Sequence, residues 1–138
     1  MNVFIDTNVL IDALLARQPF VESAEKIWFL AERGKICGQV SVLSFPNIHY
    51  IVRKLNGHAV AMSMMAMLRD TFIPVSCTEQ ILHQAIDAGM KDFEDAIQYF
   101  SALHADADCI VSRNLGHFPS TDLQIFSPDE FLAVHSFE

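Results

Sequence analysis

The stretch MNVFIDTNVLID, residues 1–12, decides the fold of this chain. Its short apolar run at residues 3–5 is typical of a strand, and Asp6 follows at once. Residues 7–15 then place apolar side chains at helical spacing. A strand that passes directly into a helix favours an α/β sheet. Asp6 is therefore expected at the carboxyl end of the strand, where open sheets bind their ligands.

A second acidic group opens a helix far along the chain. The sequence DFED at residues 92–95 precedes an apolar helical pattern that runs to about residue 105. If the fold brings Asp6 and this group together, their carboxylates would form a binding site for a hard divalent cation such as Mg²⁺. Each acid also has a structural alternative. Asp6 and Asp92 can cap the helices that follow them, and Asp95 can interact with the helix dipole.

The rest of the chain continues the alternation of strands and helices. Apolar and turn patterns predict further strands at residues 36–40, 72–75, 108–112 and 123–126. Helices are expected at residues 19–33, 44–55, 59–68, 78–88, 92–105 and 127–134. This order predicts a three-layer α/β/α sandwich around a parallel sheet of four or five strands. Asp6 and Asn114 each follow a strand, so both are expected at its carboxyl-terminal edge.

Composition limits the class of protein. The 138 residues suit a single domain over residues 1–138, and a hydrophobic content of 51% can fill its core. The apolar runs are shorter than the roughly 20 residues that span a bilayer, and no basic segment precedes the first strand. Three widely spaced cysteines suit free thiols in a reducing cytoplasm. We therefore expect a cytoplasmic protein without a membrane segment.

The net charge of −8 excludes a general nucleic-acid coating protein, because neutralising phosphates requires a basic face. A metal-dependent nuclease is compatible with this charge, since its acids gather around metal ions that then contact the phosphate.

Four motifs, in order along the chain, resemble the PIN domain family. They are DTNVL at residues 6–10, DFEDAIQ at 92–98, ADCIVSRN at 107–114 with Phe118, and FSPDEFL at 126–132. The resemblance implies a Mg²⁺- or Mn²⁺-dependent endoribonuclease like the VapC-type toxins of bacterial toxin–antitoxin pairs. Single-stranded RNA would be its substrate and an antitoxin protein its partner.

The resemblance also implies roles for individual residues. Asp6 and Asp95 match metal-binding acids, Asp92 lies one turn before Asp95, and Asn114 matches a position filled by Asp or Asn. Asp6, Asp95 and Asn114 are thus the implied catalytic residues. Such carboxylates repel one another unless a cation compensates their charge. Other polar residues near these positions are expected to contact the substrate: Thr7, Asn8, Asn47, Ser112, Arg113 and His117.

Two departures from the family pattern concern the charge of the site. Asn47 stands where the family has Glu, with no acid between Glu32 and Asp70, and His117 stands where many members have Asp. Fewer charged ligands predict weaker metal binding and a single metal ion. A PIN-like module that binds RNA or protein through a degenerate site is therefore the alternative. A haloacid dehalogenase phosphatase is disfavoured, because Asn8 replaces its second Asp.

Further expectations concern residues outside these motifs. Four methionines on one helix, at positions 62, 64, 65 and 67, favour core or subunit packing, the latter in a homodimer. A peptide-binding groove is the alternative. Glu94 is expected to face away from Asp92 and Asp95 as a solvated charge, and Asp12 has no special context.

Overall fold

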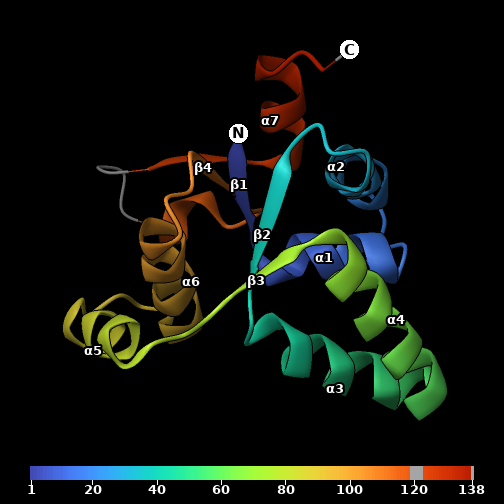
Figure 1. Cartoon of the computed structure of the whole chain (residues 1–138), viewed down its shortest axis with the longest axis horizontal. Coiled ribbons are helices and arrows are strands. Elements are labelled where there is room, and N and C mark those ends of the chain that lie inside the picture. The colour runs from blue at the N-terminus through green and yellow to red at the C-terminus, as the bar shows by residue number, and fades with distance from the viewer. Residues whose placement is uncertain (119–122, 138) are drawn as a thin grey trace.

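The computed structural model of the protein describes residues 1–118 and 123–137 (Figure 1). Its strands form one five-stranded sheet in the order β3-β2-β1-β4-β5, and every neighbouring pair is parallel. The strands are β1 (Asn2–Ile5), β2 (Cys37–Ser41), β3 (Ile73–Val75), β4 (Cys109–Val111) and β5 (Gln124–Phe126). The predicted α/β/α sandwich is therefore confirmed.

Helices cover both faces of this sheet. They are α1 (Thr7–Leu14), α2 (Val21–Glu32), α3 (Ser44–Asn56), α4 (His58–Thr71), α5 (Glu79–Asp87), α6 (Phe93–His104) and α7 (Pro128–Val134), with a short 3₁₀ helix at Leu115–His117. Figure 1 shows α5 and α6 on one side of the sheet and α1 to α4 on the other. Each predicted helix and strand is present, with bounds shifted by a few residues at most.

The two faces of β1 supply two separate cores. Val3 and Ile5 point into the larger core beneath α1, α2, α3 and α4, whereas Phe4 packs with Tyr99 of α6 and Ile110 of β4. All three β1 side chains are buried, as expected for a central parallel strand with helices on both faces. The first strand is therefore held from both sides, and this fixes the position of Asp6 at its end.

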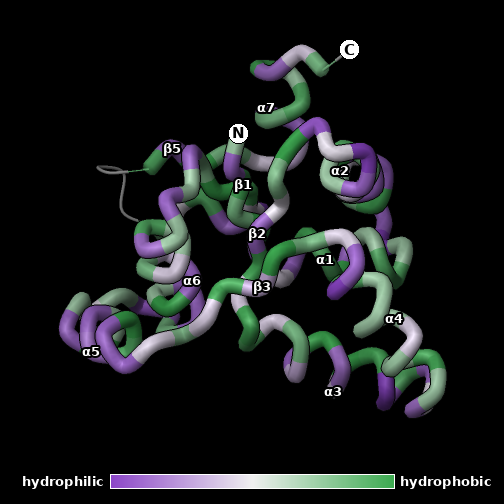
Figure 2. The backbone as a smooth tube through the Cα atoms, in the orientation of Figure 1, coloured by the Kyte–Doolittle hydropathy of each residue, from purple (hydrophilic) through white to green (hydrophobic). Residues whose placement is uncertain are grey.

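Local sequence signals set the helix starts. Ser127 and Glu130 form the predicted capping box of α7, with Pro128 at the first helical position. Thr78 caps α5 by accepting a hydrogen bond from the amide of Ile81. Figure 2 shows hydrophobic and hydrophilic residues alternating along α3, as an amphipathic helix requires.

The four methionines of α4 differ in burial. Met64 and Met65 pack partly buried against the larger core, as core packing requires, whereas Met62 and Met67 are each 48% exposed. Within the described residues, no helix is both long enough and apolar enough to cross a membrane.

Candidate active site at the carboxyl edge of the sheet

Strands β1 and β4 bring the first acid and the last motif together. Ile5 pairs with Val111 in the parallel register, and the Asp6 amide donates a 3.0 Å hydrogen bond to the Val111 carbonyl. Asp6 and Ser112 therefore follow their strands side by side. Asn114 lies two residues further on, so the predicted common edge for Asp6 and Asn114 is confirmed.

The Asp6 side chain is buried and does not cap its helix. Asp6 occupies the N-cap position of α1 but makes no side-chain capping bond, and it is only 1% exposed. Its Oδ2 atom instead accepts a 2.6 Å hydrogen bond from Ser112 Oγ, which in turn accepts one from the Asn114 amide at 3.0 Å. A buried carboxylate that does not cap its helix needs another reason to be there.

Asp92 and Asp95, at the start of α6, have different surroundings. Asp92 is the N-cap, and its Oδ1 atom accepts a 3.0 Å hydrogen bond from the Asp95 amide. The capping alternative is therefore correct for Asp92. Asp95 is buried in the first turn of α6. Its proposed metal-binding role, and that of Asp92, stay predictions.

Glu94 is exposed, as expected for a charge at the start of a helix, and its side chain contacts α3. Its Oε1 atom accepts a 3.2 Å hydrogen bond from Asn47 Nδ2 across the gap between α6 and α3. Burial raises the pKa of Glu94, and the charges of Asp6, Asp92 and Asp95 raise it further. Glu94 therefore lines the pocket where α6 approaches α3.

Hydrogen bonds join the starts of α1 and α3 to each other and α1 to the second turn of α6. The hydroxyls of Thr7 and Ser44 lie 2.7 Å apart, and the Thr7 amide donates to Gln98 Oε1 at 3.2 Å. Thr7, Ser44, Asn47, Glu94 and Gln98 all line one pocket of about 180 Å³. Sequence reasoning missed Gln98, although its i, i+4 spacing from Glu94 places both on one face of α6.

Asn8 and His117 are two further predicted substrate contacts. Asn8 is half-buried on α1. His117 lies in the 3₁₀ helix, and its side chain falls outside what the structure describes.

Arg113 forms an ion pair with the buried Asp12, for which the sequence analysis predicted no role. Its Nε atom lies 2.6 Å from Asp12 Oδ2 and its Nη2 atom 3.3 Å from Oδ1, while the guanidinium lies 4.0 Å from the Phe20 ring centroid. Burial raises the pKa of Asp12, and the hydrogen bond and charge of Arg113 oppose that effect. Arg113 thus compensates a buried charge on α1.

The donor set at the edge of the sheet suits a hard cation. Asp6, Asp92, Glu94 and Asp95 offer only carboxylate oxygens, the ligands that Mg²⁺ and Mn²⁺ prefer. Their charges already act on one another, as the raised pKa of Glu94 shows. Within residues 1–118 and 123–137, however, no three His, Cys, Asp or Glu side chains stand ready as a metal-binding group.

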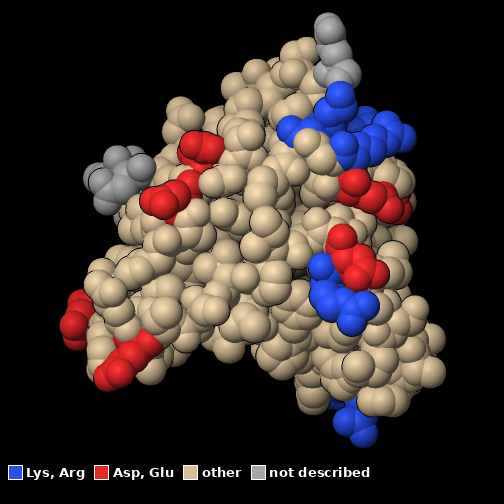
Figure 3. Space-filling view, in the orientation of Figure 1, with Lys and Arg blue, Asp and Glu red and all other residues tan. Residues whose placement is uncertain are grey.

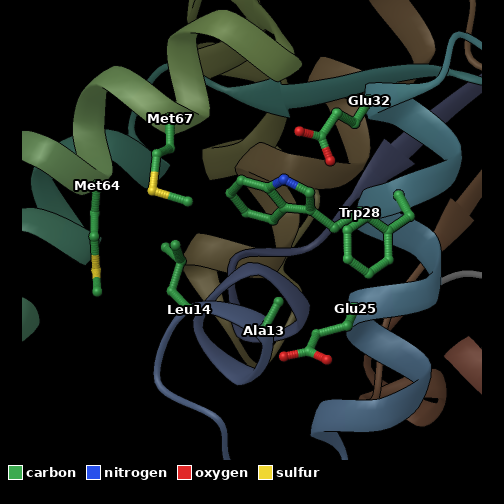
Figure 4. A pocket seen from close by; sticks show the side chains of 8 residues that line it. Ala13, Leu14, Glu25, Trp28, Glu32, Met64 and Met67 are labelled. Atoms are coloured by element: carbon green, nitrogen blue, oxygen red, sulfur yellow. The ribbon is translucent and has the colours of Figure 1, made fainter.

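A second pocket, of about 340 Å³, lies between α1, α2 and α4 and shares no residue with the acidic site. Figure 4 shows Trp28 at its centre, with Leu14, Met64 and Met67 opposite and the carboxylates of Glu25 and Glu32 on the α2 side. This pocket is apolar with an acidic margin and has no catalytic arrangement.

The family model described as PIN domain matches residues 2–116. The chain belongs to the PIN domain family. The match includes Asp6, the acids of α6 and Asn114, so the PIN resemblance of the first three sequence motifs is confirmed. Comparison with curated proteins gave no match.

Solved structures of toxin–antitoxin proteins share the PIN fold of this chain. VapBC2 from Rickettsia felis, bound to a DNA fragment from its promoter, has a TM-score of 0.70 at 12% identity and covers 92% of this chain and 98% of that one. VapBC-1 from nontypeable Haemophilus influenzae has a TM-score of 0.69 at 18% identity, covering 94% and 99%. VapC20 of Mycobacterium tuberculosis, described as a Sarcin-Ricin loop cleaving toxin, has a TM-score of 0.63 at 16% identity, covering 78% and 86%. At such identities the likeness shows the fold alone.

Proposed function

We propose that this PIN domain protein is a divalent-metal-dependent endoribonuclease that hydrolyses phosphodiester bonds of single-stranded RNA. The observation that carries the proposal is the buried Asp6 carboxylate, which caps no helix and lies at the edge of the sheet beside other acids. Such an arrangement is costly without a cation. In a PIN domain, a metal-dependent nuclease is the function that best accounts for it.

The cofactor in this proposal is Mg²⁺ or Mn²⁺, held by Asp6 and Asp95 with Asp92 beside them. When bound, such an ion activates water and stabilises charge on the scissile phosphate. In this proposal Ser112 orients the Asp6 carboxylate through its hydrogen bond, and Asn114, whose amide donates to the Ser112 hydroxyl, would orient the attacking water. Thr7 and Asn47 present polar groups to the pocket beside the acids, where a nucleotide can bind.

RNA binding in this proposal depends on local contacts and not on a broad basic surface. On the face drawn in Figure 3, Lys and Arg side chains lie over α2 and near α4 with acidic side chains beside them, whereas the charged side chains near α5 and β4 are acidic. With a net charge of −8, the protein would bind RNA chiefly through metal-bridged phosphates and single-stranded bases in its pockets.

An RNA- or protein-binding module with a degenerate site is the second candidate. Two observations favour it: Asn47 replaces an acid, and the described residues contain no ready-formed group of three metal-binding side chains. This candidate predicts RNA or partner binding without metal-dependent cleavage.

The partner in the leading proposal is an antitoxin, as in the structures of VapBC complexes that share this fold. The apolar pocket around Trp28 gives an antitoxin segment a place to insert an apolar side chain. Glu25 and Glu32 at its margin favour basic residues on either side of that anchor. The product of the neighbouring reading frame is the first partner to test.

We also propose a homodimer in the cytoplasm. Exposed apolar side chains on α3 and α4, including Tyr50, Leu55 and Met62, offer a surface for a second copy. The cysteines Cys37, Cys77 and Cys109 are all free thiols, which suits a reducing compartment. Light scattering of the purified protein tests the dimer.

The decisive experiment is cleavage of a labelled single-stranded RNA by wild type, Asp6→Asn and Asp95→Ala, in chelator and with added Mn²⁺. We expect cleavage by wild type only, abolished by chelator and restored by Mn²⁺. Asp70→Asn is the control, because Asp70 is an exposed acid in a surface pair with Arg69. Cleavage by Asp6→Asn or in chelator contradicts the proposal. RNA binding without cleavage under any metal favours the degenerate module.

A further inference from the structure

The pocket between the starts of α3 and α6 lies directly beside the buried Asp6. Its lining includes Thr7, which follows Asp6 in the chain, and its volume is about 180 Å³. Pockets for drug-sized ligands run from about 300 to 1,000 Å³, so this pocket has room for a single ring system. Single-stranded RNA offers such ring systems, because its unpaired bases turn outward and enter protein pockets.

An exposed aromatic ring forms part of the pocket wall. Phe93, the first residue of α6, lines the pocket and is 49% exposed. Leu43 and Pro46 add apolar surface from the start of α3. Unpaired bases stack on exposed aromatic rings of this kind, so Phe93 offers a stacking surface for one base.

The polar part of the lining is an ordered pair of side chains. Asn47 Nδ2 donates a 3.2 Å hydrogen bond to Oε1 of Glu94, and both residues line the pocket. Because a carboxylate only accepts hydrogen bonds, the nitrogen of the Asn47 amide faces it, and that nitrogen carries a second hydrogen. Nδ2, Oε1 and Oε2 therefore form a row of one donor followed by two acceptors.

Guanine is the RNA base whose Watson–Crick edge complements this donor–acceptor–acceptor row. Its O6 atom accepts a hydrogen bond while its N1–H and N2–H groups donate, so all three positions pair. Uracil presents an acceptor, a donor and an acceptor, so its O2 atom opposes a carboxylate oxygen. Adenine and cytosine place an accepting ring nitrogen against the middle acceptor in either orientation.

Buried contacts hold the row in place. Ser44, one turn before Asn47, is buried and contacts the Thr7 hydroxyl at 2.7 Å. Gln98, one turn after Glu94, is buried and accepts a hydrogen bond from the Thr7 amide at 3.2 Å. Helices α3 and α6 are thus joined to the same residue, so the spacing between Asn47 and Glu94 does not depend on their own contact alone.

We propose that the pocket beside Asp6 binds an unpaired guanine base of the substrate, stacked on Phe93 and read by Glu94 and Asn47. This inference rests on the proposed action on single-stranded RNA and names the base that this RNA presents near the scissile phosphate. Glu94 determines the specificity, and Asn47 both orients it and donates to guanine O6. The amide at position 47, where the family pattern has Glu, thus supplies a donor that a carboxylate lacks.

One substitution should change the base that binds. In Glu94→Gln the amide oxygen still accepts the hydrogen bond from Asn47, but the second acceptor becomes a donor. The row is then donor, acceptor and donor, which complements the Watson–Crick edge of uracil. We expect the preference to move from guanine to uracil, whereas a merely structural role of Glu94 would weaken the binding of all bases alike.

The first experiment uses free nucleosides, which carry no phosphate and so need no metal ion to bind. NMR titration of the protein in chelator compares guanosine, inosine, uridine, cytidine and adenosine. We expect guanosine to bind at least about tenfold more tightly than the other four, including inosine, which lacks only the N2 amine. Glu94→Gln should bind uridine more tightly than guanosine. Equal or undetectable affinities in wild type, or an unchanged order in Glu94→Gln, overturn the inference.

Two matched controls accompany the titration. Glu22→Gln should keep the wild-type order, because Glu22 is also the second residue of a 12-residue helix and pairs with Lys26 at the surface. Phe93→Ala should weaken all five nucleosides about tenfold without changing their order, since stacking does not distinguish bases strongly. Phe29→Ala should have no effect, because Phe29 is likewise 49% exposed on a 12-residue helix but lines other pockets. Equal losses in both phenylalanine variants contradict the stacking role.

The second experiment separates this inference from the proposed function. Wild type in Mn²⁺ is given a labelled oligoadenylate that contains one guanine, and we expect cleavage beside that guanine. Cleavage without preference for guanine overturns this inference alone. Guanosine binding without cleavage in any metal overturns the proposed nuclease activity and leaves the pocket to the RNA-binding module.

Discussion

The hydroxyl of Ser112 donates a 2.6 Å hydrogen bond to Oδ2 of Asp6, and the two residues directly follow the last paired residues of β4 and β1. Both side chains are buried. The hydroxyl also accepts a hydrogen bond from the amide of Asn114. A single Ser112 side chain thus orients both Asp6 and the turn that carries Asn114. Outer-shell partners of this kind tune the affinity of metal-binding acids.

Ser112→Ala should therefore weaken both the fold and the site. The buried Asp6 carboxylate loses its donor, which costs about 1–3 kcal/mol of unfolding free energy in chelator. Mn²⁺ affinity should fall about tenfold, because Asp6 is no longer oriented. Urea unfolding and calorimetry measure the two effects. Ser63→Ala, an exposed position on α4, is the control and should change neither. Wild-type values for Ser112→Ala would show that Asp6 is held by other means.

Arg113→Met should destabilise the protein by about 3 kcal/mol, because it leaves the buried Asp12 carboxylate without its compensating charge. Arg69→Met removes one partner of an exposed pair and should change stability by less than about 0.5 kcal/mol. Chemical unfolding at neutral pH distinguishes the two. Equal effects would mean that the Asp12–Arg113 pair contributes no more than a surface ion pair.

The same pair has a defined pH dependence. Burial raises the folded-state pKa of Asp12 above its ordinary value of 3.8, so the folded protein holds this proton more tightly than the unfolded chain. Stability then falls as pH rises from the unfolded value through the raised pKa. Arg113→Met removes the groups that oppose the shift, so its stability should fall more steeply above about pH 4 than that of wild type. Parallel stability profiles for the two proteins would contradict this account.

The pattern of the sequence was enough for the fold and for part of the site. The β1 strand, the Asp6 position and the capping box at Ser127 follow from spacing within a few residues, and the structure has all three. The partners of Glu94 and Asp12 could not be predicted in this way. They depend on which side of α6 faces α3, and on how the turn after β4 meets α1. Buried contacts far apart in the chain, such as Thr7 with Gln98, decide both.

Gly38→Ala should destabilise the sheet by about 1–3 kcal/mol through overpacking. A Cβ atom at Gly38 on β2 would lie 2.5 Å from Cδ1 of Phe72, whose ring is buried and packs edge-on against Trp28 with centroids 4.8 Å apart. Thermal unfolding tests this, with Gly116→Ala as control, because a Cβ atom there meets open space. Phe72→Leu in the Gly38→Ala background should recover part of the loss. Equal stability of the two glycine variants would show that Phe72 can move aside freely.

Met67→Lys should weaken antitoxin binding while leaving RNA cleavage unchanged. Met67 lines the apolar pocket beside Trp28, and a lysine there replaces apolar contact and repels the basic residues that Glu25 and Glu32 would attract (Figure 4). Losing such a contact should weaken binding at least tenfold. Met62→Lys is the matched control, because Met62 lies on the same helix, is also 48% exposed and lines a different pocket. Binding is measured by calorimetry with the co-purified product of the neighbouring reading frame. Equal loss in both variants would place the partner across α4 as a whole, and loss in neither would place it away from this pocket.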